Sequence, residues 1–143
     1  MSGKYQGSTA TSSATAVPNT PRLLWSDTIG GGAVSDENAL GLHLEAGGYG
    51  TQTGEVWATL NGQEVFRETV GGETTLVADL DVWRNTPSTA DVSGFEAIDG
   101  ISGQIADRAV TGGLAWGSSQ TLAIYGQSSA TGGILLRRAG VLR

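Results

Sequence analysis

Glycine is the feature that most limits what this 143-residue chain can fold into, because 23 glycines divide it into short pieces. Many stand together: Gly30-Gly31-Gly32, Gly47-Gly48, Gly71-Gly72, Gly112-Gly113 and Gly132-Gly133. Glycine reaches positive-φ turn conformations without steric cost, so such clusters are typical of turns. Few segments between them are long enough for a helix, and short strands joined by turns are expected instead.

The strongest local pattern is a hairpin in which residues 55–60 and 63–70 flank Asn61-Gly62. Asn-Gly is the preferred two-residue type I′ turn, and such a turn fixes the register of its strands. That register predicts Trp57 opposite Phe66, a favourable cross-strand aromatic pair. Apolar residues then occupy both faces of the hairpin, so we expect one face in the core and the other covered by a partner.

Further strands are expected at residues 23–25, 40–44, 74–83, 109–116, 121–125 and 134–142. In residues 40–44, leucines alternate with Gly41 and His43, which gives one apolar face. Residues 95–106 contain Gly100 and Gly103, so this segment is expected to be a loop with one helical turn at most. The sequence therefore predicts an all-β body: a β-sandwich, a jelly roll or a small barrel.

The first 20 residues differ from the rest, since Ser, Thr and Ala dominate and large apolar side chains are nearly lacking. Such a segment buries too little apolar surface to fold alone, and it is ordered only where another chain or the body holds it. Pro18 and Pro21 mark the start of the folded part. We expect an extended low-complexity N-terminal arm at 1–20 and a β-rich body domain at 21–143.

The net charge of −6 is unevenly distributed, because all 14 acidic residues lie between Asp27 and Asp107. Only Arg67 and Arg84 oppose them inside that range, and both ends of the chain carry only bases. An acidic body argues against nucleic-acid binding. The basic ends suit an acidic partner or an acidic neighbouring copy, and ordinary solubility charge is the alternative. The sequence has no transmembrane run and no signal-peptide core, so we expect no membrane partner and synthesis in the cytoplasm.

Residues that could carry chemistry are few. With no Cys and one His, the chain offers no thiolate site and no histidine-based zinc site. His43, between Leu42 and Leu44, is expected at the surface or an interface. Asp79 and Asp81 share one face of a strand. Two carboxylates in this position could form a glycosidase pair, but solvated positions are favoured. We therefore expect a chain that is not an enzyme and takes no metal or cofactor.

The aromatic side chains leave two interpretations open. They could form a sugar-stacking platform, or Trp57, Trp83 and Trp116 could fill a core otherwise built from small residues. The core interpretation is favoured.

A Ser/Thr/Ala-rich arm (residues 8–16 above all), a compact acidic β body and no recognisable active site together resemble the capsid decoration, or cement, proteins of tailed bacteriophage heads. The resemblance is one of architecture and composition. It implies a non-catalytic structural protein on the capsid surface of a virion, made in the host cytoplasm. It also implies that arm and body bind the major capsid protein or another virion protein, and that the body forms a homo-oligomer, with a trimer favoured.

Two alternatives stay open: a carbohydrate- or receptor-binding β module of a tail or surface appendage, and an enzyme with an unusual carboxylate site. The candidate interface residues lie in the arm, on the hairpin and near the basic ends of the body: Ser2, Lys4, Tyr5, Thr9, Thr11, Ser13, Arg22, Trp57, Phe66, Arg137 and Arg138.

Overall fold

The computed structural model describes residues 20–34, 38–48, 53–129 and 133–142. The predicted arm, with its candidate residues Ser2, Lys4, Tyr5, Thr9, Thr11 and Ser13, lies outside the described residues. The strands follow one another in chain order: β1 (Arg22–Ile29), β2 (Ala39–Gly48), β3 (Gly54–Leu60), β4 (Gln63–Val70), β5 (Thr75–Thr86), β6 (Thr89–Ile98), β7 (Ile101–Val110), β8 (Gln120–Ser128) and β9 (Ile134–Leu142). Within the described residues, no helix has the length and apolar character needed to cross a bilayer.

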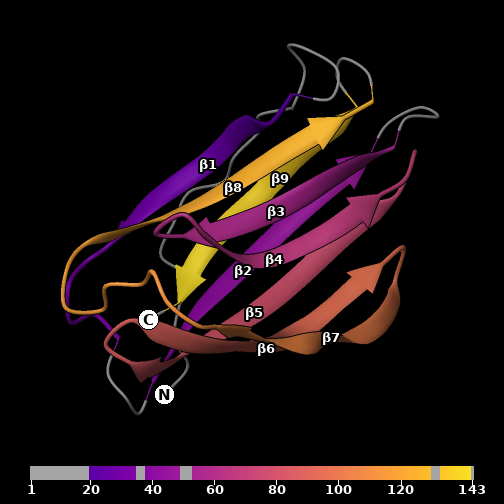
Figure 1. Ribbon diagram of the computed structural model, residues 1–143. Helices are drawn as coiled ribbons and strands as arrows, with labels where there is room; N and C mark the ends of the chain where they lie inside the picture. Colours follow the sequence, from indigo (N-terminus) through magenta and orange to yellow (C-terminus); the bar gives the residue numbers. More distant parts are fainter. Residues whose placement is uncertain (1–19, 35–37, 49–52, 130–132, 143) are drawn as a thin grey trace.

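The strands form two antiparallel sheets that pack face to face (Figure 1). One sheet has the order β1-β8-β3-β4, and the other has the order β7-β6-β5-β2-β9. The sheets do not close into a barrel, so of the three all-β architectures expected from the sequence the sandwich is the one observed.

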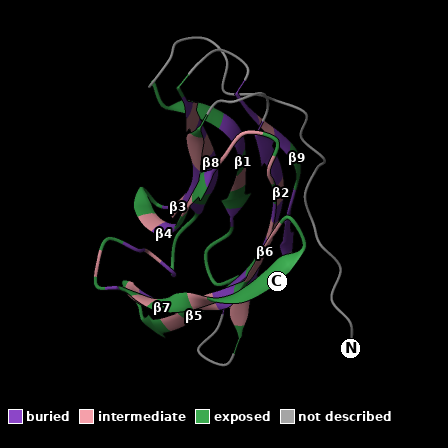
Figure 2. Ribbon diagram, turned by 90° about the vertical axis from the view of Figure 1, so that its right-hand side faces the viewer, coloured by how far each residue is buried: buried purple, intermediate pink, exposed green. Residues whose placement is uncertain are grey.

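The core lies between the sheets and follows from the alternation of inward and outward side chains along the strands, which is interrupted at the bulges. Leu40, Leu42 and Leu44 of β2 are fully buried, as the alternating pattern predicts. Leu122 and Ile124 of β8 face them from the other sheet. Buried residues accordingly recur along the strands of both sheets in Figure 2, whereas most residues of β7 are exposed.

Every edge strand carries one extra residue relative to its neighbour. The unpaired residue is Leu24 on β1, Val65 on β4 and Arg137 on β9. On β7 the extra residue falls between Ile105 and Arg108, which pair with Gly94 and Val92. Such β-bulges kink a strand and raise its local twist, which makes the edge a poor template for a further strand.

The β4 bulge corrects the predicted hairpin register. The turn at Asn61-Gly62 is present, with φ of 50° and 80°. Beyond Glu64, however, Phe66 pairs with Ala58, and Trp57 pairs with Arg67 instead of Phe66. The physical reason is burial: the extra residue lets the neighbours Val65 and Phe66 both be buried against the core.

Two further expectations were wrong. The segment 95–106, expected to be a loop, forms a hairpin between β6 and β7 that turns at Asp99-Gly100, where φ is 51° and 82°. Asp-Gly satisfies the same type I′ requirement as Asn-Gly. The predicted strand 109–116 ends at Val110, and Trp116 lies buried in the following loop, where its Nε1 donates to the Thr89 carbonyl at 3.0 Å.

Candidate functional site

Two aromatic side chains stand exposed on the outer surface of the five-stranded sheet. Trp83 of β5 is 44 % exposed and Phe95 of β6 is 65 % exposed. Trp83 was expected in the core, but Leu80 and Val82 take the inward positions of β5, so alternation directs Trp83 outward. We use the name aromatic face for one part of the outward surface of β5 and β6, which consists of Asp79, Asp81, Trp83, Asn85, Asp91, Ser93 and Phe95.

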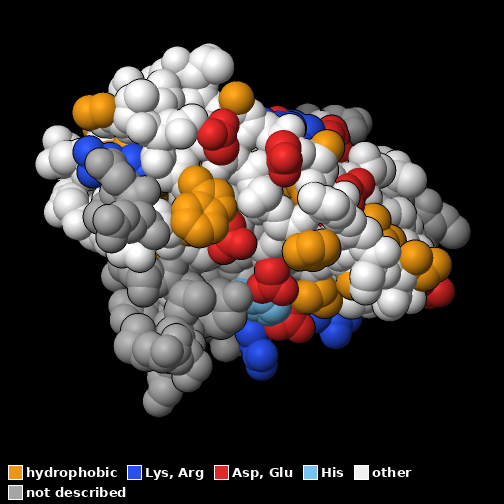
Figure 3. Space-filling model, turned by 90° about the horizontal axis from the view of Figure 1, so that it is seen from below, with side chains coloured by type: hydrophobic (Ala, Val, Ile, Leu, Met, Phe, Trp, Pro, Cys, Tyr) orange, Lys and Arg blue, Asp and Glu red, His pale blue; other side chains and the backbone are white. Residues whose placement is uncertain are grey.

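Figure 3 shows the molecule from the side of the five-stranded sheet. This side can be recognised by the pale blue side chain of the single His of the chain. Hydrophobic and acidic side chains alternate across this surface.

The register places each exposed ring directly opposite a carboxylate. Trp83 pairs with Asp91, and Phe95 pairs with Asp79. Asp81 and Ser93 form the pair between them. With a rise of about 3.4 Å per residue, the two rings are rooted about 14 Å apart along the sheet. The aromatic face is thus two ring–carboxylate pairs around a polar centre.

Both carboxylates are oriented by a neighbouring nitrogen. Asn85 Nδ2 donates to Asp91 Oδ2 at 2.6 Å, and His43 Nδ1 lies 2.7 Å from Asp79 Oδ1. His43 sits on the side of β2 opposite Leu42 and Leu44, as expected from the sequence. Because Asn85 holds Asp91 through one oxygen, that carboxylate has lone pairs left to accept hydrogen bonds from a ligand.

The charges of this face shift two pKa values. Burial lowers the pKa of His43, but its hydrogen bonds to Glu45 and Asp79 outweigh burial and hold that pKa above its usual value. Burial and the neighbouring Asp79 raise the pKa of Asp81. Asp79 and Asp81 do share one solvated face, as predicted.

A shallow depression of about 390 Å³ adjoins the Trp83 pair. It is lined by Asp91, Val92, Ser93, Asp107, Arg108 and Ala109. It lies where β7 bulges away from β6, and Asp91 stands between it and Trp83 because Asp91 pairs with both Trp83 and Ala109. The arrangement offers a ring for stacking, carboxylates that accept hydrogen bonds, and a hollow beside them.

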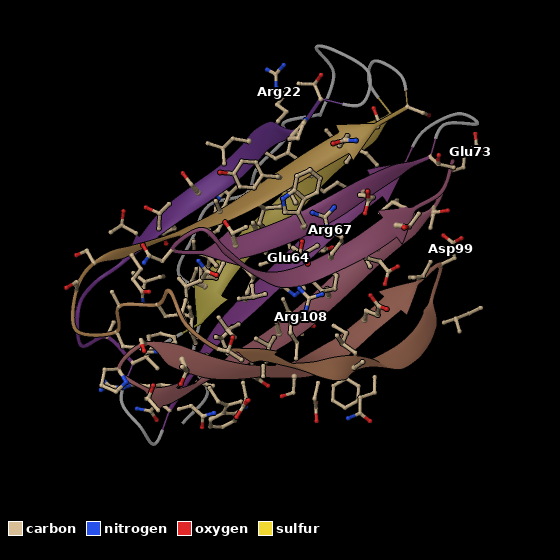
Figure 4. All side chains as sticks on the ribbon, viewed as in Figure 1. Arg22, Glu64, Arg67, Glu73, Asp99 and Arg108 are labelled. Carbon is tan, nitrogen blue, oxygen red and sulfur yellow. The ribbon has the colours of Figure 1, made fainter. Side chains whose placement is uncertain are left out.

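The outer surface of the four-stranded sheet holds a tryptophan in different surroundings. Trp57 is only 8 % exposed, because the Tyr125 ring stacks on it at 5.8 Å and Arg67 Cζ lies 4.4 Å from its ring centroid. Glu64 holds Arg67 Nε at 2.7 Å, and Glu55 holds Arg67 Nη1 at 3.0 Å (Figure 4). The chain itself therefore covers Trp57, one of the candidate interface residues.

The sheets meet in a polar cluster at their β4 and β7 edges. Arg108 Nη1 of β7 lies 2.6 Å from Glu64 Oε2 of β4, an ion pair that joins the two sheets. Near it, Glu96 points inward and shares a hydrogen bond with Glu68, and burial together with this neighbour raises the pKa of Glu96 to about 7. A pocket of about 240 Å³ lies here, with Phe66 and Ile105 in its lining. Sequence reasoning missed Glu96, although alternation with Val92 and Gly94 marks it as inward.

The predicted interface residues do not form one patch. Phe66 is buried in the core and gives no surface to a partner. Arg22 is exposed at the start of β1, next to Leu23, which is 50 % exposed. Arg137 and Arg138 are exposed on β9, at the edge of the other sheet, with Arg138 Nε 3.5 Å from Glu45 Oε2.

In the part of the chain that the structure describes, no three or more acidic or histidine side chains gather where they could hold a metal ion. No family model matches the chain, and no significant match to it was found among curated proteins or solved structures.

Proposed function

We propose that this chain is a non-catalytic structural protein of a virion. It attaches to a capsid shell through its N-terminal arm and the adjoining edge of its body. In this proposal the partner is the major capsid protein or another virion protein, and the body forms a homo-oligomer, a trimer being favoured because three-fold positions on a shell accept three-fold partners.

The observation that carries the proposal is the surface at the start of β1. Leu23, half exposed, and Arg22 directly follow the arm, so a partner held by the arm meets them first. Burying a side chain such as Leu23 contributes about 1.5–3 kcal/mol. Weak contacts of this size add up to strong attachment when arm and edge bind together and several copies share one shell.

The proposal is tested by co-sedimentation with purified capsids of the virus that encodes the chain. We expect the full chain to pellet with capsids and the chain lacking residues 1–19 to remain in the supernatant. Leu23→Ser should weaken pelleting by about tenfold. Ile101→Ser is the matched control, because Ile101 is 78 % exposed but lies on β7, at an edge of the other sheet.

Light scattering on the same samples gives the native mass, with a trimer expected. Circular dichroism shows whether the shortened chain keeps its β fold. A full chain that never pellets with capsids, or a folded shortened chain that pellets as well as the full one, would contradict the proposal.

A further inference from the structure

We propose that the aromatic face is a binding site for a neutral oligosaccharide, with one sugar unit stacked on Trp83 and another on Phe95. This site lies on the five-stranded sheet, whereas Arg22 and Leu23 lie on the other sheet. It therefore stands independently of capsid attachment.

The Trp83 pair has the parts that a sugar ring requires. A pyranose presents an apolar C–H surface that stacks on an aromatic ring, and hydroxyl groups around its rim that donate hydrogen bonds. Trp83 supplies the ring, and Asp91, directly opposite, supplies acceptor oxygens. Asn85 fixes that carboxylate at 2.6 Å, so the acceptor is oriented before the ligand arrives.

The depression beside Asp91 gives the ligand room. Its volume of about 390 Å³ falls within the range of small-molecule sites. Ser93 and Asp107 add a hydroxyl and a second carboxylate to its lining. Both groups can pair with sugar hydroxyls. Among the residues that line the depression, the one cation is Arg108, and Glu64 holds it in an ion pair.

The Phe95 pair repeats the same design. Asp79 lies opposite Phe95, and His43 orients Asp79 at 2.7 Å as Asn85 orients Asp91. The repeat lies about 14 Å away along the same sheet. Two equivalent pairs at this spacing point to an extended chain of sugars rather than a single one.

Charge selects among glycans. Asp79, Asp81 and Asp91 stand in adjacent positions of the face, and Asp107 lines the depression. These carboxylates repel sialic acids and uronic acids, so the ligand is neutral.

A protein partner fits this surface less well. Protein interfaces have a contiguous apolar centre inside a polar rim. Here the polar pair Asp81 and Ser93 occupies the centre, and the rings stand apart on either side of it. Isolated rings, each beside a carboxylate, suit a ligand that itself alternates apolar and hydroxyl surfaces.

The test is an array of immobilised oligosaccharides probed with the full chain. Neutral glucose, mannose, galactose and N-acetylglucosamine oligomers are compared with sialylated and uronate-containing ones. The best ligand is then titrated calorimetrically. We expect a neutral oligomer to bind and the charged sets to be ignored.

Variants locate the site. Trp83→Ala should weaken the affinity by about tenfold or more, and Phe95→Ala and Asp91→Asn by somewhat less, about three- to tenfold. Ile101→Ala is the control, since it removes an exposed apolar side chain of the same sheet outside both pairs. Thermal melts confirm folding, and Asp91→Asn keeps the test valid if an aromatic variant does not fold.

Three results would overturn the proposal: no neutral glycan retained by the wild-type chain, preferred binding of the acidic glycans, or a glycan affinity that Trp83→Ala and Phe95→Ala leave unchanged. Capsid co-sedimentation of Trp83→Ala should equal that of wild type, so either proposal can fail without the other.

Discussion

Trp57 and Trp83 both project outward from the middle of a strand, but on opposite sheets and with opposite surroundings. Trp57 lies between Tyr125 and Arg67 and is nearly covered. Trp83 has small or acidic neighbours and keeps almost half of its surface in solvent. An outward tryptophan is thus covered by neighbouring side chains on the four-stranded sheet, and it is left exposed on the five-stranded sheet.

The difference separates stability from recognition. A covered ring contributes to folding because its apolar surface leaves water, whereas an exposed ring contributes little until a ligand covers it. The four-stranded outer surface is therefore expected to support the fold, and the aromatic face is expected to support binding. Measurements on single variants can break or sharpen this division.

The largest effect is expected from Trp57→Ala. It removes the ring from between Tyr125 and Arg67, and truncations of buried aromatics cost about 3–5 kcal/mol in full cores. Because Trp57 lies on the outer surface, we expect a loss of about 2–4 kcal/mol in the free energy of unfolding, measured by urea titration. A loss below about 0.5 kcal/mol, the range of ordinary surface changes, would remove the contrast between the two tryptophans.

The next effect concerns pH and the pair formed by Glu96 of β6 and Glu68 of β4, the strand that also carries Arg67. The pKa of Glu96 is about 7 in the fold against 4.5 in the unfolded chain. Its contribution to stability is therefore complete below pH 4.5 and is lost as the pH rises through 7. Raising the pKa from 4.5 to about 7 corresponds to about 3 kcal/mol for a fully buried group, and partial exposure reduces this to about 1–2 kcal/mol.

Glu64 has the opposite sign, which makes the pH test specific. Burial raises the pKa of Glu64, but Arg67 and Arg108 outweigh burial and lower it, so its contribution is lost as the pH falls below 4.5. Glu96→Gln should remove most of the decline between pH 4.5 and 7, and Asp81 and His43, whose pKa values are also raised, account for the rest. The loss of stability below pH 4.5 should stay unchanged. A wild-type stability that stays flat from pH 4.5 to 7.5 would refute the shared proton.

A smaller effect is expected from Arg67→Gln, which uncovers Trp57 without removing it. Cation–π contact with a partly exposed ring contributes about 0.5–1 kcal/mol. We expect a loss of about 1 kcal/mol and a rise in the quenching of Trp57 fluorescence by acrylamide, followed in a background where Trp25, Trp83 and Trp116 are Phe. Unchanged quenching would show that Tyr125 alone covers the ring.

The smallest effect is expected from Trp83→Ala without ligand. Since solvent already reaches this ring, the free energy of unfolding should change by no more than about 0.5 kcal/mol. Urea titration beside Trp57→Ala gives the direct comparison. A loss of about 2 kcal/mol or more would show that Trp83 stabilises the fold as Trp57 does, and it would contradict the proposed difference between the two tryptophans.

Much of the strand pattern could be predicted because it depends on local rules. The Asn61-Gly62 turn, the alternating leucines of β2 and the bounds 134–142 of β9 all follow from period and turn chemistry. The alternation of Leu80 and Val82 also indicates that Trp83 points outward. The expectation that tryptophans fill the core was given more weight, and it was wrong for Trp83. Asp99-Gly100 carried the same signal as Asn61-Gly62, but the nearby Gly103 hid it; on the exposed strand β7 a glycine costs no packing.

The rest depended on tertiary packing. No local rule places the extra residue at Val65, because the bulge exists to bury Val65 and Phe66 together against the other sheet. The stack of Arg67 on Trp57 follows from that bulge, and the meeting of Glu68 with Glu96 follows from the way the β4 and β7 edges face one another. The pairing of each exposed ring with an aspartate needed the β5–β6 register, which the sequence did not supply.

The irregular borders of both sheets have a consequence for how closely copies can be crowded. Proteins rich in β-strands tend to form fibres when many copies are held side by side, because a regular edge strand can pair with a strand of the next copy. Here all four borders are kinked by a supernumerary residue, at Leu24, Val65, Arg137 and the Ile105–Arg108 stretch. Molecules of this chain can therefore be packed densely without joining edge to edge into fibres, and each keeps Trp83 and Phe95 exposed.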